Sequence, residues 1–225
     1  MRFLSSTVLL CVVACVVPAL GEDIFDPPWD ATLPNQTSQT WEIPQLIQTG
    51  PIEPDLPRLP TIMENPYGDA TISFLAPINI EPIPGPHGEP IDTVHIGPGG
   101  GQLVIDIFNN EDPLAQKLIF WQITSDKSPT PTGSPPMTNP PGTSLPSPYP
   151  QIQWPNGTWY TYNGLISIQP NPDREQIIFD LVESTNISEI VIDTVCVPEP
   201  STLALLGAGA VALLVGVRRR RRARA

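Results

Sequence analysis

The sequence predicts a mainly β fold: a small antiparallel β-sandwich, jelly-roll-like, with Pro-rich irregular segments and a single C-terminal transmembrane helix. Three observations carry this prediction. Short runs of alternating apolar and polar residues recur between turn residues, and no window shows the 3.6-residue period of an amphipathic helix. Many of the 31 prolines gather in two stretches, where they disfavour helices and central strands. The last apolar run ends in a cluster of arginines.

The N-terminus has the pattern of a secretory signal peptide over residues 1–21. A positively charged start leads into the apolar run Phe3–Val17, and small residues then mark a cleavage site before Glu22. The alternatives are an uncleaved membrane anchor and a lipoprotein acylated at Cys15. Cleavage before Glu22 would leave Cys196 without an internal disulfide partner in the mature chain, so this thiol would be inert or pair between chains.

Two segments are rich in proline. In residues 22–69 a proline recurs every few positions, which predicts extended, polyproline-type chain rather than helices or interior strands. Residues 125–150 are dominated by Pro, Ser, Thr and Gly and contain almost no aliphatic side chain. This composition is typical of a linker or an O-glycan carrier, and its length favours local disorder.

The β-sandwich is predicted over residues 70–196, a length that can enclose one core. The turn at 97–101 is glycine-rich, and Asn163-Gly164 is the signature of a type I′ hairpin. Alternation and turn residues predict strands at 70–75, 93–96, 102–108, 117–124, 158–162, 165–168, 176–182 and 189–195.

The C-terminal segment 197–225 joins a Pro-Glu-Pro motif, an uncharged run at 203–217 and a basic tail at 218–225. The run would form roughly 22 Å of helix against about 30 Å of hydrocarbon, so the span is thin. Arginines beside a span stay on the cytoplasmic side, which places the chain from Glu22 to about Ser201 outside. The topology would therefore be set by Arg218, Arg219, Arg220, Arg221 and Arg222.

Together these features resemble the PEP-CTERM domain, a bacterial sorting signal. The resemblance rests on Pro198, Glu199 and Pro200, followed by the apolar helix and the basic cluster. It implies processing by an exosortase, a membrane-embedded transpeptidase, and delivery to the cell surface or an extracellular polysaccharide matrix. The two prolines hold the backbone extended, as a protease cleft requires. The alternative is a plain tail anchor that is not processed.

The charge distribution excludes one class of partner. Seven of the 11 basic residues lie at the two ends, and all 23 acidic residues lie between Glu22 and Glu199, so the exported part carries a net charge of −19. Such a surface repels nucleic acid and anionic lipid. The basic tail has no interleaved aromatic residues, and we expect it to set topology rather than to bind nucleic acid.

Residues suited to catalysis are few. The two histidines, His87 and His95, fall in a turn and a strand, and no nucleophile, zinc or redox motif is present. We therefore expect a protein that is not an enzyme and has no resident cofactor. Two alternatives stay open: a secreted glycan-active enzyme with a carboxylate pair, and a calcium-dependent adhesion module that uses Glu111-Asp112 or Asp173 with Glu175.

The strongest hint of binding is aromatic. Trp154, Trp159, Tyr160 and Tyr162 crowd into nine residues, and exposed rings of this kind can stack on sugars. Alternation puts Trp159 on the opposite face from the two tyrosines, so one set would belong to the core. The sequence thus predicts an exported structural or adhesive module, associated with exopolysaccharide at the cell surface or in the matrix.

Overall fold

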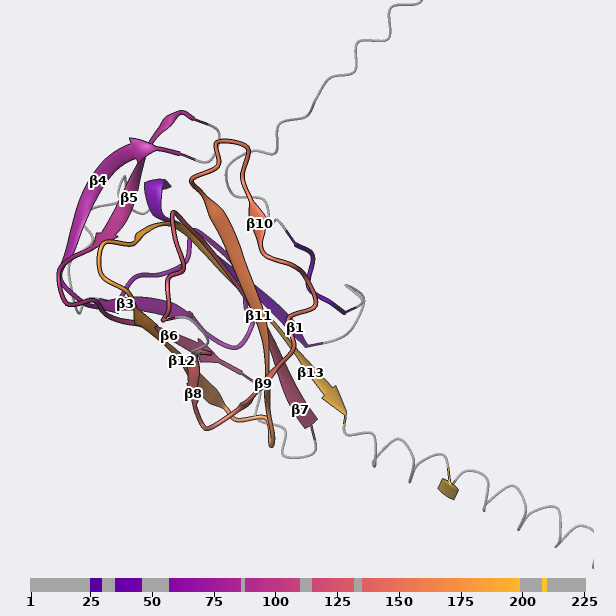
Figure 1. Cartoon of the computed structure of the whole chain (residues 1–225). Coiled ribbons are helices and arrows are strands. Elements are labelled where there is room, and N and C mark those ends of the chain that lie inside the picture. The colour runs from indigo at the N-terminus through magenta and orange to yellow at the C-terminus, as the bar shows by residue number, and fades with distance from the viewer. Residues whose placement is uncertain are drawn as a thin grey trace, which may run out of the picture.

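The computed structural model describes residues 25–29, 35–45, 57–85, 88–109, 115–131, 135–198 and 208–209. The described chain is mainly β, and its strands form two antiparallel sheets (Figure 1). Within these ranges no helix is both long and apolar enough to cross a membrane. The predicted signal peptide at 1–21 and, apart from two residues, the predicted span at 203–217 lie outside the described residues.

The larger sheet has nine strands. Its main path runs β10-β11-β7-β13-β1-β2, while β9 pairs with β11 and β5 joins the start of β13 and pairs with β4. The long strands β7, β11 and β13 run together through the middle of the domain (Figure 1). The strands are β1 (Gln36–Glu42), β2 (Ile62–Glu64), β4 (Ile78–Pro84), β5 (Pro90–Ile96), β7 (Ala115–Ser125), β9 (Thr143–Leu145), β10 (Ile152–Gln153), β11 (Tyr160–Ile168) and β13 (Asn186–Pro198).

The smaller sheet has four strands in the order β3-β6-β12-β8. The register pairs the full length of β12 with β6, so these two strands form its centre. The strands are β3 (Thr71–Leu75), β6 (Gly101–Phe108), β8 (Met137–Asn139) and β12 (Arg174–Leu181).

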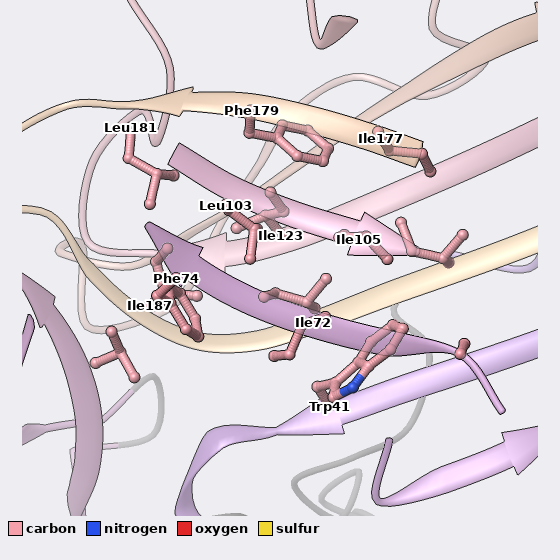
Figure 2. Packing of buried hydrophobic residues seen from close by; sticks show 14 of the residues in the cluster. Trp41, Ile72, Phe74, Leu103, Ile105, Ile123, Ile177, Phe179, Leu181 and Ile187 are labelled. Atoms are coloured by element: carbon pink, nitrogen blue, oxygen red, sulfur yellow. The ribbon is translucent and has the colours of Figure 1, made fainter. Parts of the chain in front are cut away.

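One core lies between the two sheets. In the longer strands alternate residues point inward, as the period of two requires, and Figure 2 shows side chains of both sheets meeting there. Full burial of one such side chain stabilises the fold by about 1.5–3 kcal/mol. The prediction of a mainly β, antiparallel fold is therefore confirmed, while its jelly-roll-like connectivity stays a prediction. The smaller sheet contributes Ile72, Phe74, Leu103, Ile105, Ile107, Ile177, Phe179 and Leu181, and the larger sheet contributes Trp41, Val94, Ile96, Ile119, Ile123, Ile166, Ile168, Ile187, Ile190 and Ile192.

The glycine-rich turn at 97–101 connects the two sheets, because β5 belongs to the larger sheet and β6 to the smaller one. Gly100 has a φ of 68°, and a Cβ atom there would lie 2.3 Å from the carbonyl oxygen of Leu181. Only glycine fits both the backbone conformation and the space. A second crossing, from β12 to β13, lies beside it, since Ser184 N donates to Ile96 O over 2.7 Å.

The predicted hairpin at Asn163-Gly164 is wrong. β11 runs without a break from Tyr160 to Ile168, and Gly164 pairs with Trp121 of β7. A Cβ atom on Gly164 would lie 2.6 Å from the indole of Trp121. The glycine therefore makes room for a neighbouring side chain instead of forming a turn, a known use of glycine within strands.

The expectation that residues 22–69 contain no interior strand is wrong for 36–42. This proline-free stretch forms β1, which pairs with β13 over its whole length and with β2 on its other side, so strands of the sandwich precede residue 70. Residues 25–29 are also packed against the larger sheet. The ring of Phe25 stacks on Tyr149 with 4.7 Å between centroids, and its backbone N–H donates to Gln122 Oε1 over 3.2 Å.

The segment 125–150 contains two short strands where an irregular linker was expected. β8 pairs with β12 in the smaller sheet, and β9 pairs with β11 in the larger one. The segment therefore passes from one sheet to the other and adds an edge strand to each. Its prolines fit this role, because edge strands and their flanks tolerate residues that lack an N–H donor.

Candidate functional site

The sorting segment begins at the end of a central strand. β13 lies between β1 and β7, and its last residue, Pro198, pairs with Ala115 at the start of β7. The half-buried Cys196 pairs with Lys117 two positions earlier. Of the predicted motif, Glu199 and Pro200 lie outside the described residues, as do the five arginines at 218–222.

Close to this end, three polar side chains meet inside the sandwich. Lys117 lies on β7 in phase with the core residue Ile119, so alternation turns it inward. Glu175 lies on β12 in phase with the core residue Ile177. Asn109 follows β6 directly, and its backbone N–H donates to Asp173 O over 2.8 Å, which continues the ladder between β6 and β12. We call Lys117, Asn109 and Glu175 the buried polar cluster.

The contacts within the buried polar cluster are direct. Lys117 Nζ donates to Asn109 Oδ1, and Asn109 Nδ2 donates to Glu175 Oε2. Lys117 Nζ lies 3.8 Å from Glu175 Oε1, and that oxygen has no hydrogen-bond partner in the part of the chain that the structure describes. The side chain of Glu175 is 0 % exposed and that of Lys117 is 1 % exposed, so water does not screen these contacts.

Burial sets the protonation of the cluster. Desolvation lowers the pKa of Lys117 from 10.5, although Glu175 and Cys196 act in the opposite direction. Desolvation also raises the pKa of Glu175 from 4.5 to about 7, against the opposing effect of Lys117. Both shifts favour the neutral forms, as expected where two ionisable groups leave water together.

The sequence suggests a different role for Glu175, as a calcium ligand together with Asp173. The structure separates the two, because Glu175 is buried and Asp173 is exposed. Among the described residues no group of three or more His, Cys, Asp or Glu side chains could hold a metal ion, and the other candidate pair, Glu111-Asp112, lies outside them. One feature of the sequence indicates the buried polar cluster: Lys117 is a charged residue in phase with inward-pointing apolar neighbours.

The four rings of the predicted aromatic platform do not lie on one face in the structure. Trp159 is 1 % exposed, and its Nε1 donates to Pro84 O over 2.7 Å, so this ring belongs to the interior. Tyr160 and Tyr162 point to the other face of β11, as alternation predicted, and both are half-buried. Their ring centroids lie 6.1 Å apart. Trp154 is half-buried too, and its Nε1 donates to Thr161 Oγ1 over 3.1 Å.

The two tyrosines lie at the opposite end of β7 from the buried polar cluster, because Tyr160 pairs with Ser125. Burial raises the pKa of Tyr162, and the neighbouring Tyr160 and Asp126 add to this shift. Gln153 Nε2 donates to the hydroxyl of Tyr160 over 3.0 Å. The two rings and these polar groups offer a surface on which a sugar ring could stack and form hydrogen bonds.

A second polar network lies at this same end. Asp126 accepts from the backbone N–H of Asn186 over 2.9 Å and from its Nδ2 over 2.7 Å. His95 Nδ1 lies 3.0 Å from Asn186 Oδ1 and 3.8 Å from Glu81 Oε2. The sequence predicts a structural role for His95. The network agrees with this role, because it joins His95 to β13. The other histidine, His87, lies outside the described residues.

Comparison with known proteins identifies a C-terminal sorting signal in this chain. Residues 197–222 match the PEP-CTERM protein-sorting motif, which confirms the resemblance drawn from Pro198, Glu199 and Pro200. Such a motif implies export and a membrane-anchored intermediate that an exosortase processes. No curated protein and no solved structure matches the chain.

Proposed function

We propose that the β domain is a structural or adhesive module, not a catalytic one, that works at the cell surface or in the extracellular matrix. An exosortase would release it from a membrane-anchored intermediate and hand it over for association with exopolysaccharide. The observation that carries this proposal is the position of the sorting motif. The match starts at Val197, inside β13, so the folded module and the signal that delivers it are continuous.

The geometry of the domain supports an adhesive role. The sorting motif leaves from one end of the larger sheet, and the half-buried rings of Tyr160 and Tyr162 lie at the other end. A molecule held at its C-terminal end would therefore present these rings away from the attachment point. Aromatic faces bind the apolar faces of sugars without requiring charge, which suits a domain with a large excess of acidic residues.

The experiment that tests sorting determines the mature C-terminus. The full chain is produced in a host with an exosortase and in the same host without it, and the surface fraction is analysed by mass spectrometry. We expect protein that ends within the sorting motif only when the exosortase is present. A matched variant, Glu199→Ala, should stay with the membrane fraction at its full length. Intact peptides from Val195 through Leu214 in surface material would contradict the proposal.

A further inference from the structure

The buried polar cluster brings together an amine, a carboxamide and a carboxyl group. Lys117 and Glu175 come from strands in different sheets, and Asn109 follows a third strand. All three side chains are buried. An enclosed site of this kind holds reacting groups in contact and keeps water away from them, which are two of the ways in which proteins accelerate reactions.

Lys117 is placed to act as a nucleophile. An amine attacks only in its unprotonated form, and burial in apolar surroundings favours that form, as the lowered pKa of Lys117 shows. Its direct partner is the carboxamide of Asn109, whereas the carboxylate oxygen Glu175 Oε1 lies 3.8 Å away. The amine therefore contacts the group that it can attack more closely than the group that would pair with its charge.

Glu175 is placed to move protons. Its pKa is raised to about 7, so both the protonated and the ionised forms of this carboxyl group are populated near neutral pH. Its Oε2 contacts Asn109 Nδ2, and its Oε1, which has no hydrogen bond among the described residues, faces Lys117 Nζ. One carboxyl group thus reaches both the nitrogen that would leave and the nitrogen that would attack, and such a group can serve as acid and base in one step.

We propose that Lys117 and Asn109 become joined by an intramolecular isopeptide bond, with Glu175 as the group that transfers the proton. Lys117 Nζ attacks Asn109 Cγ, a bond forms between these two atoms, and the bond between Cγ and Nδ2 breaks. Glu175 takes a proton from Nζ and gives a proton to Nδ2, so that ammonia leaves and Glu175 ends as it began. The reaction needs no oxidant, metal or other reactant.

The alternative is an ordinary buried ion pair between Lys117 and Glu175. Such a pair offsets the cost of desolvation only when its geometry is close and its remaining polar atoms are hydrogen-bonded. Here the charged atoms lie 3.8 Å apart, and Glu175 Oε1 accepts no hydrogen bond from the described residues. The arrangement is poor as an ion pair and suitable as a reaction site.

The bond would connect the two sheets. Asn109 follows β6 of the smaller sheet, and Lys117 lies near the start of β7 of the larger sheet. It would also lie beside the exit of β13, because Lys117 pairs with Cys196. The proposal is independent of the proposed function, since the chemistry requires only the folded domain.

The test is the mass of the purified full chain and of its peptides. We expect the intact mass to fall below the calculated mass by that of one ammonia molecule. Trypsin should fail to cut after Lys117, because the bonded side chain carries no charge. Glu111 lies between the two residues, and Glu81 and Glu89 both precede prolines, which block cleavage, so digestion after glutamate and then with trypsin should yield peptide 65–111 covalently joined to peptide 112–127.

A succinimide at Asn109 would also release ammonia, and the digest separates the two products. A succinimide leaves Lys117 open to trypsin and the two peptides unjoined. The variants Lys117→Met, Asn109→Ala and Glu175→Gln should each have their full calculated mass, while the exposed control Lys127→Met should still lose ammonia. Tryptophan fluorescence checks that each variant folds. Separate peptides 65–111 and 112–117 from folded wild-type protein would overturn the proposal without reference to any variant.

Discussion

Two asparagines, each in contact with a carboxyl group, lie near opposite ends of the sandwich, and their surroundings differ. Asn186 binds Asp126 through two hydrogen bonds in a network that is partly open to solvent. Asn109 contacts Glu175 and Lys117 in the interior. Lys117 and Asp126 are separated by nine positions along the chain, about 30 Å of strand. The contact between Asn186 and Asp126 joins two segments of the chain. The cluster around Asn109 has the groups and the burial that formation of the isopeptide bond requires.

The comparison shows that burial decides what an asparagine and a carboxyl group can do together. Where water has access, the carboxyl group of Asp126 serves as an acceptor for both nitrogens of Asn186. Without water the pKa of Glu175 rises and that of Lys117 falls, which creates an acid next to a nucleophile. Two predictions test this difference and a third tests the tyrosine rings at the open end, from the largest expected effect to the smallest.

Removal of Lys117 should have the largest effect on stability. In Lys117→Met, Asn109 Oδ1 loses its buried donor and the proposed bond between the sheets cannot form, so we expect the free energy of unfolding to fall by at least about 1–3 kcal/mol. Urea unfolding followed by tryptophan fluorescence measures this loss. The matched change at the other end of the sandwich, Asp126→Asn, should lower the free energy of unfolding by about 1 kcal/mol, because water can replace the lost hydrogen bond to Asn186. Equal losses of stability in Lys117→Met and Asp126→Asn would contradict the claim that burial distinguishes the two sites.

The Lys117→Met variant should also become sensitive to pH. The raised pKa of Glu175 means that the folded state keeps a proton that the unfolded state has released, so stability falls as the pH rises above 4.5. Lys117 holds this pKa down to about 7, so its removal extends the decline to higher pH. The side chain that contacts this carboxyl in the variant is that of Asn109, which follows β6, while Cys196 of β13 pairs with position 117.

Urea unfolding at several pH values between 4 and 8 measures the decline. The double variant Lys117→Met with Glu175→Gln should lack this part of the decline. Burial also raises the pKa of Glu42, but that carboxyl is present in both variants and cancels in the difference. Identical curves for the single and double variants would mean that Glu175 titrates normally.

The smallest effect on stability is expected at the open end. Tyr160 is half-buried, so Tyr160→Ala should cost about 0.5–1 kcal/mol, mainly through the lost contact with the ring of Tyr162. Retention on immobilised exopolysaccharide should nevertheless fall about tenfold if the two rings stack on sugars. Tyr67→Ala, at a half-buried tyrosine elsewhere on the domain, is the control. Unchanged retention of a folded Tyr160→Ala protein would exclude these rings as the binding surface.

The sequence predicts the strands that have a clear period of two and an apolar inward face. β7, β12 and β13 follow this pattern, and the phase of Lys117 with Ile119 indicates that a lysine points inward. Its partners could not be identified in the same way. Asn109 and Glu175 reach Lys117 only because β6, β7 and β12 meet across two sheets, and no local pattern contains that information.

The errors have the same cause. Asn163-Gly164 matches a hairpin locally, but Trp121 of another strand occupies the space that a side chain at 164 would need. β1 was missed because the surrounding prolines dominated the composition, although residues 35–43 contain none. In both places a contact between distant segments outweighs the local preference, as happens often in β proteins.

The position of β13 has a mechanical consequence. This strand is bonded to β1 on one side and to β7 on the other, and its last residues enter the sorting motif. A pull between a tethered C-terminus and a ligand at the far end therefore acts along the strand. Hydrogen bonds in an antiparallel ladder are perpendicular to the strands, so this load shears many of them together instead of opening them one by one. The domain should thus resist tension best in the direction in which attachment to a surface would apply it.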